Sequence, residues 1–134
     1  MARPADSNPT PLELEILKVL WDQSPLQVGE IRDALAETGR DNAHTSVITM
    51  LNIMVGKSYL DKRKEGRGFV YWPVVSQKNV SQNMLTDLVE RAFSGSSGML
   101  MLHLLENEDG LDEEELIELR KLINKRVREQ RGGQ

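Results

Sequence analysis

The side chains that could do chemistry in this 134-residue sequence are few, and they form no catalytic set. The chain has no cysteine, so it offers no thiol nucleophile, no thiolate metal ligand and no disulfide. Its two histidines, His44 and His103, stand alone, and neither an H-E-x-x-H pair nor a nucleophile elbow occurs. The acidic residues from Glu106 to Glu118 lack the spacing of a calcium loop. The sequence therefore predicts a protein that is not an enzyme and that has no catalytic, metal or cofactor site.

The residues best suited to recognition are short polar side chains on one face of a helix expected over residues 43–57. Val47, Leu51 and Met54 fall within a narrow arc at about 100° per residue and predict a buried stripe. The opposite face carries uncharged hydroxyl and amide groups, on Thr45, Ser46, Thr49 and Asn52. Reading base edges in the DNA major groove requires such donors and acceptors, whereas a face suited only to solubility would carry more Glu and Lys. DNA readout is the prediction, and a core helix with a solvated outer face is the alternative.

Basic residues gather on the segment that follows this helix. Two runs with aromatic and apolar content, residues 59–64 and 69–73, flank a turn with two glycines, which predicts a β-hairpin. Its cationic side chains are Lys62, Arg63, Lys64 and Arg67. The net charge of the chain is −4, but six Lys or Arg residues against three acids lie between positions 40 and 67. This local excess favours phosphate contact; the alternative is a charged hairpin that only protects an edge strand. His44 is a further candidate for a phosphate contact or an ordinary surface histidine.

Two helices before this segment must position these groups. Thr10, Pro11 and Glu13 have the spacing of a capping box with proline at the first helical position. A second helix is expected to begin near Gln27 and to end at Gly39. The expected core consists of Ile16, Leu20, Ile31, Leu35, Val47 and Leu51. Three helices followed by a basic hairpin is the order of a winged helix-turn-helix, and residues 1–75 are predicted to form this DNA-binding domain.

The rest of the chain, residues 76–134, shows helical periodicity again. Apolar positions recur from Val80 to Ala92, and a last helix is expected to begin at Asp112, where Glu115 completes a second capping pattern. About sixty residues in three helices bury little surface alone, so we expect this segment to form a homodimer. The candidate dimerisation residues are Met84, Leu85, Leu88, Val89, Phe93, Leu116, Leu119 and Ile123.

The predicted fold class is therefore mainly α with a small β-hairpin, a winged helix-turn-helix followed by a helical dimerisation segment. A hydrophobic share of 39% and a charged share of 28% are ordinary for a globular protein. No apolar run approaches the ~18 residues that span a bilayer. The residues after Met1 lack the apolar stretch of a signal peptide, and a cytoplasmic location is expected.

Several stretches of the chain resemble the BlaI/MecI family of penicillinase repressors. The similarity runs roughly from Thr10 to Lys125. The stretches that carry it are LELEILKVLW at 12–21, TSVITML at 45–51, GRGFVY at 66–71 and ELRKLI at 118–123. No single stretch is decisive, but the ordered set is specific.

This resemblance assigns roles to residues and also marks differences. It implies that Thr45, Ser46 and Thr49 occupy recognition-helix positions that face DNA, and that the hairpin cations lie where a wing approaches phosphates. Two positions depart from the family's pattern. Ile53 stands where members often carry Arg, and Ser58 stands where they often carry Gly.

The resemblance implies a dimeric repressor that binds a palindromic double-stranded DNA operator and releases it after proteolytic cleavage. In such systems a membrane metalloprotease-sensor starts the cleavage. For this chain no small-molecule substrate is evident from the sequence. The better-known repressors present an Asn-Phe bond, which this chain lacks; alignment on Leu119-Arg120 places Leu104-Leu105 or their neighbours there. A copper-sensing branch uses C-terminal cysteines, so that branch is excluded.

An alternative function is a winged-helix module that binds another protein through the same helix or hairpin, without direct DNA readout. A winged helix does not by itself prove DNA binding. A large exposed apolar patch around Ile48 and Ile53, with no positive charge nearby, would favour this alternative.

Overall fold

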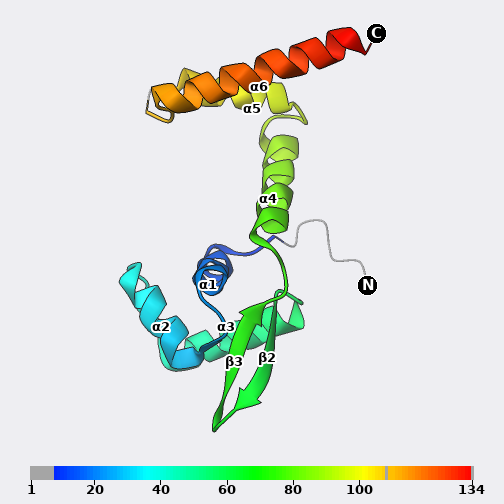
Figure 1. Cartoon of the computed structure of the whole chain (residues 1–134). Helices are drawn as coiled ribbons and strands as arrows, with labels where there is room; N and C mark the ends of the chain where they lie inside the picture. The colour runs from blue at the N-terminus through cyan, green and yellow to red at the C-terminus, as the bar shows by residue number, and fades with distance from the viewer. Residues whose placement is uncertain (1–7, 108, 134) are drawn as a thin grey trace. The chain divides into compact units, whose positions relative to one another are not determined.

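The computed structural model describes residues 8–107 and 109–133. The chain divides into two compact units, Met1–Asp87 and Leu88–Gln134, and Figure 1 shows the elements of each. In chain order they are α1 (Pro11–Asp22), β1 (Leu26–Gln27), α2 (Val28–Glu37), α3 (His44–Gly56), β2 (Leu60–Glu65), β3 (Gly68–Pro73), α4 (Gln77–Ala92), α5 (Ser97–Glu106) and α6 (Glu113–Gly132). The predicted fold class, a winged helix followed by helices, is confirmed. The two compact units divide after Asp87, inside α4. The domain boundary predicted after residue 75 remains a prediction.

The first helix begins where its sequence signals predict. Thr10 Oγ1 accepts a hydrogen bond from the Glu13 backbone N–H at 3.3 Å, and Glu13 Oε1 accepts one from the Thr10 backbone N–H at 2.8 Å. These reciprocal bonds satisfy two donors that the helix itself leaves unpaired. Pro11 occupies the first helical position, where the missing N–H has no intrahelical partner to lose. The predicted capping box is therefore confirmed.

The helices α1, α2 and α3 share one apolar core. The six core residues predicted from the sequence are each no more than 2% exposed: Ile16, Leu20, Ile31, Leu35, Val47 and Leu51. Gly39 follows α2 with a φ of 92°, a conformation that favours glycine. Because α3 turns its apolar stripe into this core, its opposite face is left at the surface.

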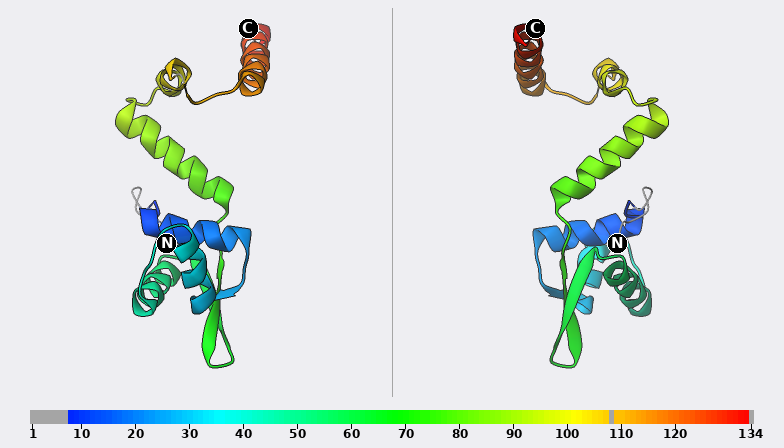
Figure 2. Two further views of the ribbon diagram at one scale, coloured as in Figure 1. Left: turned by 90° about the vertical axis from the view of Figure 1, so that its left-hand side faces the viewer. Right: turned by 90° about the vertical axis from the view of Figure 1, so that its right-hand side faces the viewer.

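Three strands form one antiparallel sheet in the order β1-β3-β2. The strands β2 and β3 make the predicted hairpin, which we call the wing (residues 60–73), with Gly66 in its turn at a φ of 64°. Figure 2 shows the wing projecting beyond α1, α2 and α3. The strand β1 was not predicted from the sequence; its two residues pair with Val70 and Tyr71 of β3. A two-residue strand is too short to show an alternating pattern.

A hydrogen bond links the segment that follows the wing to α1. The indole Nε1 of Trp21 donates a hydrogen bond of 2.9 Å to the carbonyl oxygen of Val75. This bond joins residues far apart in the sequence and fixes the path of the chain before α4 begins.

The second unit contains helices with well-defined starts but little core. Asp112 Oδ1 accepts a 2.8 Å bond from the Glu115 N–H, and Glu115 Oε1 accepts a 3.2 Å bond from the Asp112 N–H, which confirms the predicted cap of α6. Ser96 caps α5 by accepting a 3.1 Å bond from the Met99 N–H. No side chain of α5 or α6 among the described residues is buried. In the same described part of the chain, no helix combines the length and apolar character needed to cross a bilayer.

A serine with a left-handed backbone conformation, Ser58, lies just after the end of α3. It follows the C-cap residue Lys57 with a φ of 65°, and the next N–H, of Tyr59, donates to the carbonyl of Met54 at 2.9 Å. Glycine adopts this left-handed conformation without the clash that a Cβ meets. We expect Ser58→Gly to raise the free energy of unfolding by roughly 0.5–1 kcal/mol in urea titrations. The control Ser58→Ala keeps the Cβ and should not; a gain of equal size from both variants would contradict this explanation.

Candidate nucleic-acid interface

The outer face of α3 presents the polar residues that the sequence singled out. We call this set the recognition face, and all of its members are exposed: Thr45, Ser46, Thr49 and Asn52. On the opposite side Val47, Leu51 and Met54 are each no more than 2% exposed. With 3.6 residues per turn, burial of one stripe turns the other toward solvent. Both predicted faces of this helix are therefore placed as expected.

Two members of the recognition face already make hydrogen bonds within the chain. The Thr49 hydroxyl donates to the Thr45 carbonyl at 2.9 Å, which uses its one proton and leaves its oxygen as an acceptor. The Asn52 Oδ1 accepts a 3.1 Å bond from Lys62 Nζ of the wing. The Lys62 ammonium also lies 4.5 Å from the centroid of the Phe69 ring. These contacts join the recognition face to the wing.

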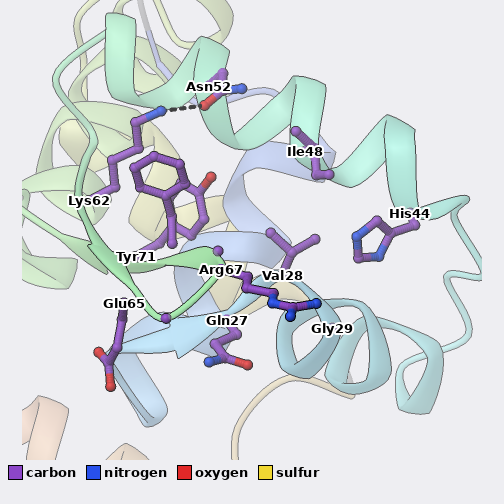
Figure 3. A pocket seen from close by; sticks show the side chains of 13 residues that line it. Gln27, Val28, Gly29, His44, Ile48, Asn52, Lys62, Glu65, Arg67 and Tyr71 are labelled. Carbon is purple, nitrogen blue, oxygen red and sulfur yellow. Dashed lines mark hydrogen bonds between the residues drawn. The ribbon is translucent and has the colours of Figure 1, made fainter.

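A groove of about 650 Å³ lies between α3, the start of α2 and the wing (Figure 3). Its lining includes His44 of α3, Val28 and Gly29 of the first turn of α2, and Arg67, whose side chain extends from the wing toward that turn. The first backbone N–H groups of a helix carry a partial positive charge, and Arg67 adds a full one. Glu65, at the rim, is the one carboxylate among the described lining residues. The groove therefore suits an anionic ligand that has several oxygen atoms.

A buried phenol lies in this groove. Tyr71 is 2% exposed, and no described residue makes a hydrogen bond with its hydroxyl. Burial raises the pKa of Tyr71 above its ordinary value of 10.0, so the hydroxyl keeps its proton at neutral pH. A donor without a partner at this place can bond to an incoming oxygen.

The remaining cations of the wing are not equivalent. Arg63 lies 3.4 Å from Glu65 Oε2, and its guanidinium lies 5.8 Å from the centroid of the Trp72 ring. The side chains of Lys64 and Arg67 are exposed and form no hydrogen bond or ion pair with any described residue. Side chains alternate along a strand, so Lys64 lies on the same face of β2 as Lys62, which lines the groove, and Arg63 lies on the other face. Lys64 and Arg67 are therefore the wing cations whose charges are not engaged by another described side chain.

A buried ion pair holds the end of α3 against α1. The Glu13 side chain is 1% exposed, and its Oε2 lies 2.8 Å from Lys57 Nζ. Burial raises the pKa of the Glu13 carboxyl, but the hydrogen bonds from Lys57 and Thr10 and the charge of Lys57 outweigh this effect. The pKa of Glu13 consequently lies below its ordinary value of 4.5. The sequence identified Glu13 as a capping residue, but a capping pattern carries no signal that the carboxylate is also buried against a lysine.

The predicted dimerisation residues lie on α4, α6 and the residue after α4. Five of them are between 36% and 49% exposed: Leu85, Leu88, Leu116, Leu119 and Ile123. Met84 and Phe93 are half-buried. Val89 is 8% exposed and therefore already largely covered within one chain.

Further exposed apolar residues lie on α5, which the sequence reasoning did not include in the dimerisation set. Met101, Leu102 and Leu104 are 58%, 56% and 53% exposed. An apolar groove of about 660 Å³ lies between α5 and α6, with Leu105 and Leu122 in its lining. The sequence could have indicated this apolar surface, since residues 99–105 carry only His103 as a polar side chain.

The described residues contain no cluster of three or more His, Asp or Glu side chains that could hold a metal ion. What the first unit offers instead is a three-helix core, a wing and a polar outer face on the third helix, which together define the winged helix-turn-helix class. The model of the penicillinase repressor family matches residues 9–125. The chain belongs to this family, which is one of transcriptional repressors rather than enzymes. The resemblance inferred from the sequence is thereby confirmed.

The penicillinase repressor of Bacillus licheniformis agrees with this assignment, and two further proteins are similar to this chain. The chain is 32% identical to the penicillinase repressor of Bacillus licheniformis over 111 residues, which cover 83% of this chain and 85% of that protein. It is 23% identical to the methicillin resistance regulatory protein MecI of Mammaliicoccus sciuri over 114 residues, 85% of this chain and 91% of that one. A solution structure of the DNA-binding domain of the repressor BlaI is 30% identical, with a TM-score of 0.49, and the match covers 59% of this chain and 93% of that chain.

The buried ion pair makes the stability of the first unit depend on pH. Lys57→Met leaves the Glu13 carboxylate buried without its counter-charge, and we expect a loss of about 2 kcal/mol near pH 7, because Lys57 itself is partly exposed. A carboxyl with a lowered folded pKa contributes stability above its unfolded pKa, and this contribution is lost as the pH falls through the folded pKa. The difference between the parent and the variant should therefore shrink in urea titrations below about pH 4.

A surface pair provides the control for this prediction. Lys18 lies 3.9 Å from Glu15, and both side chains are partly exposed. Lys18→Met should change the unfolding free energy by less than about 0.5 kcal/mol at either pH. A Lys57→Met effect that is the same at both pH values would show that Glu13 is not the source of the loss.

Proposed function

We propose that this chain is a sequence-specific DNA-binding repressor that acts in the cytoplasm as a homodimer on a palindromic operator. The observation that carries the proposal is the recognition face, an exposed row of uncharged donors and acceptors on the third helix of a winged helix. It stands beside a groove lined by cations and by the first turn of α2. Membership of a repressor family supports the same conclusion.

DNA contacts would divide into two kinds. The recognition face enters the major groove and reads base edges through Thr45, Ser46, Thr49 and Asn52. The phosphate backbone passes along the groove beside it, where the first turn of α2, the Tyr71 hydroxyl and Arg67 can each donate a hydrogen bond. His44 lines the same groove. Phosphate contacts would set the register, and base contacts would set the sequence.

The competing function, a protein-docking module, has less support. Ile53 is 44% exposed on α3, but Ile48 is only half-exposed and lines the same groove as Lys62 and Arg67. An apolar docking patch would be expected to extend over several neighbouring residues without charges among them.

The homodimer would form through the exposed apolar side chains of α5 and α6. No described side chain of these helices is buried in a single chain, which is unusual for helices so rich in Leu and Met. The first turn of α6 carries Glu113, Glu114 and Glu115, and its last part carries Arg128 and Arg131. Two copies of α6 packed antiparallel would bring acidic ends against basic ends, and a twofold axis makes such a surface self-complementary.

Relief of repression would follow from loss of this dimer. We propose that a cut between Phe93 and Asp112, started by a membrane metalloprotease-sensor, separates the dimer-forming helices from the DNA-binding unit. His103, Leu104 and Leu105 are exposed on α5 within this interval. The two half-sites would then be bound independently, with much weaker affinity.

Binding should be steeply dependent on salt concentration. We expect the double variant Lys64→Ala and Arg67→Ala to flatten the slope of log affinity against log salt by about two, because each lost phosphate contact removes about 0.9. Arg63→Ala is the control, since its guanidinium already contacts Glu65 and lies near the Trp72 ring. Electrophoretic mobility shifts at several salt concentrations provide the measurement. If the slope falls as much for the control as for the double variant, the assignment of Lys64 and Arg67 as the phosphate-contacting cations is wrong.

Dimerisation should depend on the apolar side of α6. We expect the full-length double variant Leu119→Lys and Ile123→Lys to sediment as a monomer. Its operator affinity should fall by about 10² or more, because linkage of the two half-site contacts is lost. Lys121→Glu, on the same helix but at a residue paired on the surface with Glu118, is the control and should remain a dimer. A parent chain that sediments as a monomer would contradict the proposed assembly.

A further inference from the structure

The orientation of the Asn52 amide is fixed by the wing. Its Oδ1 lies 3.1 Å from Lys62 Nζ. A lysine ammonium has three donors and no acceptor, so only the oxygen of the amide can face it. Figure 3 shows the result, with Oδ1 toward Lys62 and the amide nitrogen on the side away from it. The group that Asn52 offers to a ligand is therefore its NH₂, which donates.

Lys62 is itself held in this position. Its ammonium lies 4.5 Å from the centroid of the Phe69 ring, and the side chain is half-buried rather than exposed. Across the segments that the structure describes, the Asn52 oxygen is the one hydrogen-bond acceptor of this ammonium. Lys62 differs in this respect from Lys64, which lies two residues further along the same strand and is exposed without such a contact.

The orientation of the Asn52 amide affects which base it can recognise, because adenine and guanine present different donors and acceptors. An asparagine with both amide atoms free recognises adenine, donating to N7 and accepting from N6. Guanine presents two acceptors, N7 and O6, and no donor at the same edge. Because Lys62 holds the amide oxygen toward the wing, the NH₂ group is the part of Asn52 turned to a base. A donor in that position fits guanine better than adenine.

We propose that Lys62 is a positioning residue that presents Asn52 as a donor, so that the chain selects guanine over adenine at the base pair facing Asn52. This proposal rests on the proposed function, and it gives Lys62 a different role from the phosphate contact expected from the sequence. The neighbouring Thr49 offers a hydrogen-bond acceptor instead of a donor, because its hydroxyl proton is donated to the Thr45 carbonyl. Thr49 has no bond to the wing, so its base preference should not depend on Lys62.

Selection from a pool of random duplex DNA by the full chain, followed by sequencing, tests the proposal. The base pair that faces Asn52 is the one whose preference disappears in Asn52→Ala. At that position the parent should enrich guanine over adenine. In Lys62→Met the amide oxygen is released, and the guanine-to-adenine ratio should fall by about tenfold. Preferences at the other positions, including the one lost in Thr49→Val, should stay as in the parent.

Lys64→Met is the matched control, because it removes the same charge from the same strand. It should reduce the salt dependence of binding and leave the guanine preference unchanged. If Lys62→Met behaves in the same way, Lys62 is a phosphate contact and the proposal is wrong. A parent that enriches adenine at the Asn52 position would also overturn it. A parent that enriches no sequence would overturn the proposed function itself, which separates the two failures.

Discussion

The buried carboxylate of Glu13 is the group on which the geometry of the first unit depends. One oxygen caps α1 through the Thr10 N–H, and the other lies 2.8 Å from Lys57, directly after the last residue of α3. The start of α3 has no side-chain cap, since its N-cap residue is Ala43. The helix is therefore positioned by this pair and by the packing of its apolar stripe. A shift of α3 away from α1 would leave a buried charge without a partner, which is strongly destabilising.

This constraint explains why the outer face of α3 can remain polar and still be rigid. The helix has its apolar residues in the core and its end held by Lys57, so the recognition face needs no packing partner of its own. The contact between Asn52 and Lys62 then joins that face to the wing. A DNA duplex would meet two elements whose relative position is already fixed, which lowers the entropy lost on binding.

Much of this arrangement could be predicted from the sequence, because it follows from local rules. Capping at Thr10 and Asp112 and the apolar stripe of α3 depend on residues three or four apart. Contacts between distant segments could not be predicted in this way. The strand β1 forms where Leu26 and Gln27 pair with β3. The buried Glu13 has its counter-charge in Lys57, which lies 44 residues further along the chain. The positive φ of Ser58 was also unexpected for a serine, although the family's frequent glycine at that position was the signal.

Site-directed DNA cleavage tests the central claim, that the recognition face of α3 enters the major groove of two half-sites at once. The chain contains no cysteine, so Ser46→Cys provides a unique thiol for an iron chelate on that face. On a selected DNA site we expect two symmetric cleavage clusters, one in each half-site, with centres about one helical turn or a small multiple of it apart. A chelate attached to Lys18→Cys, on the exposed side of α1, should give little cleavage. A single cluster, or equal cleavage from both attachment sites, would contradict the account.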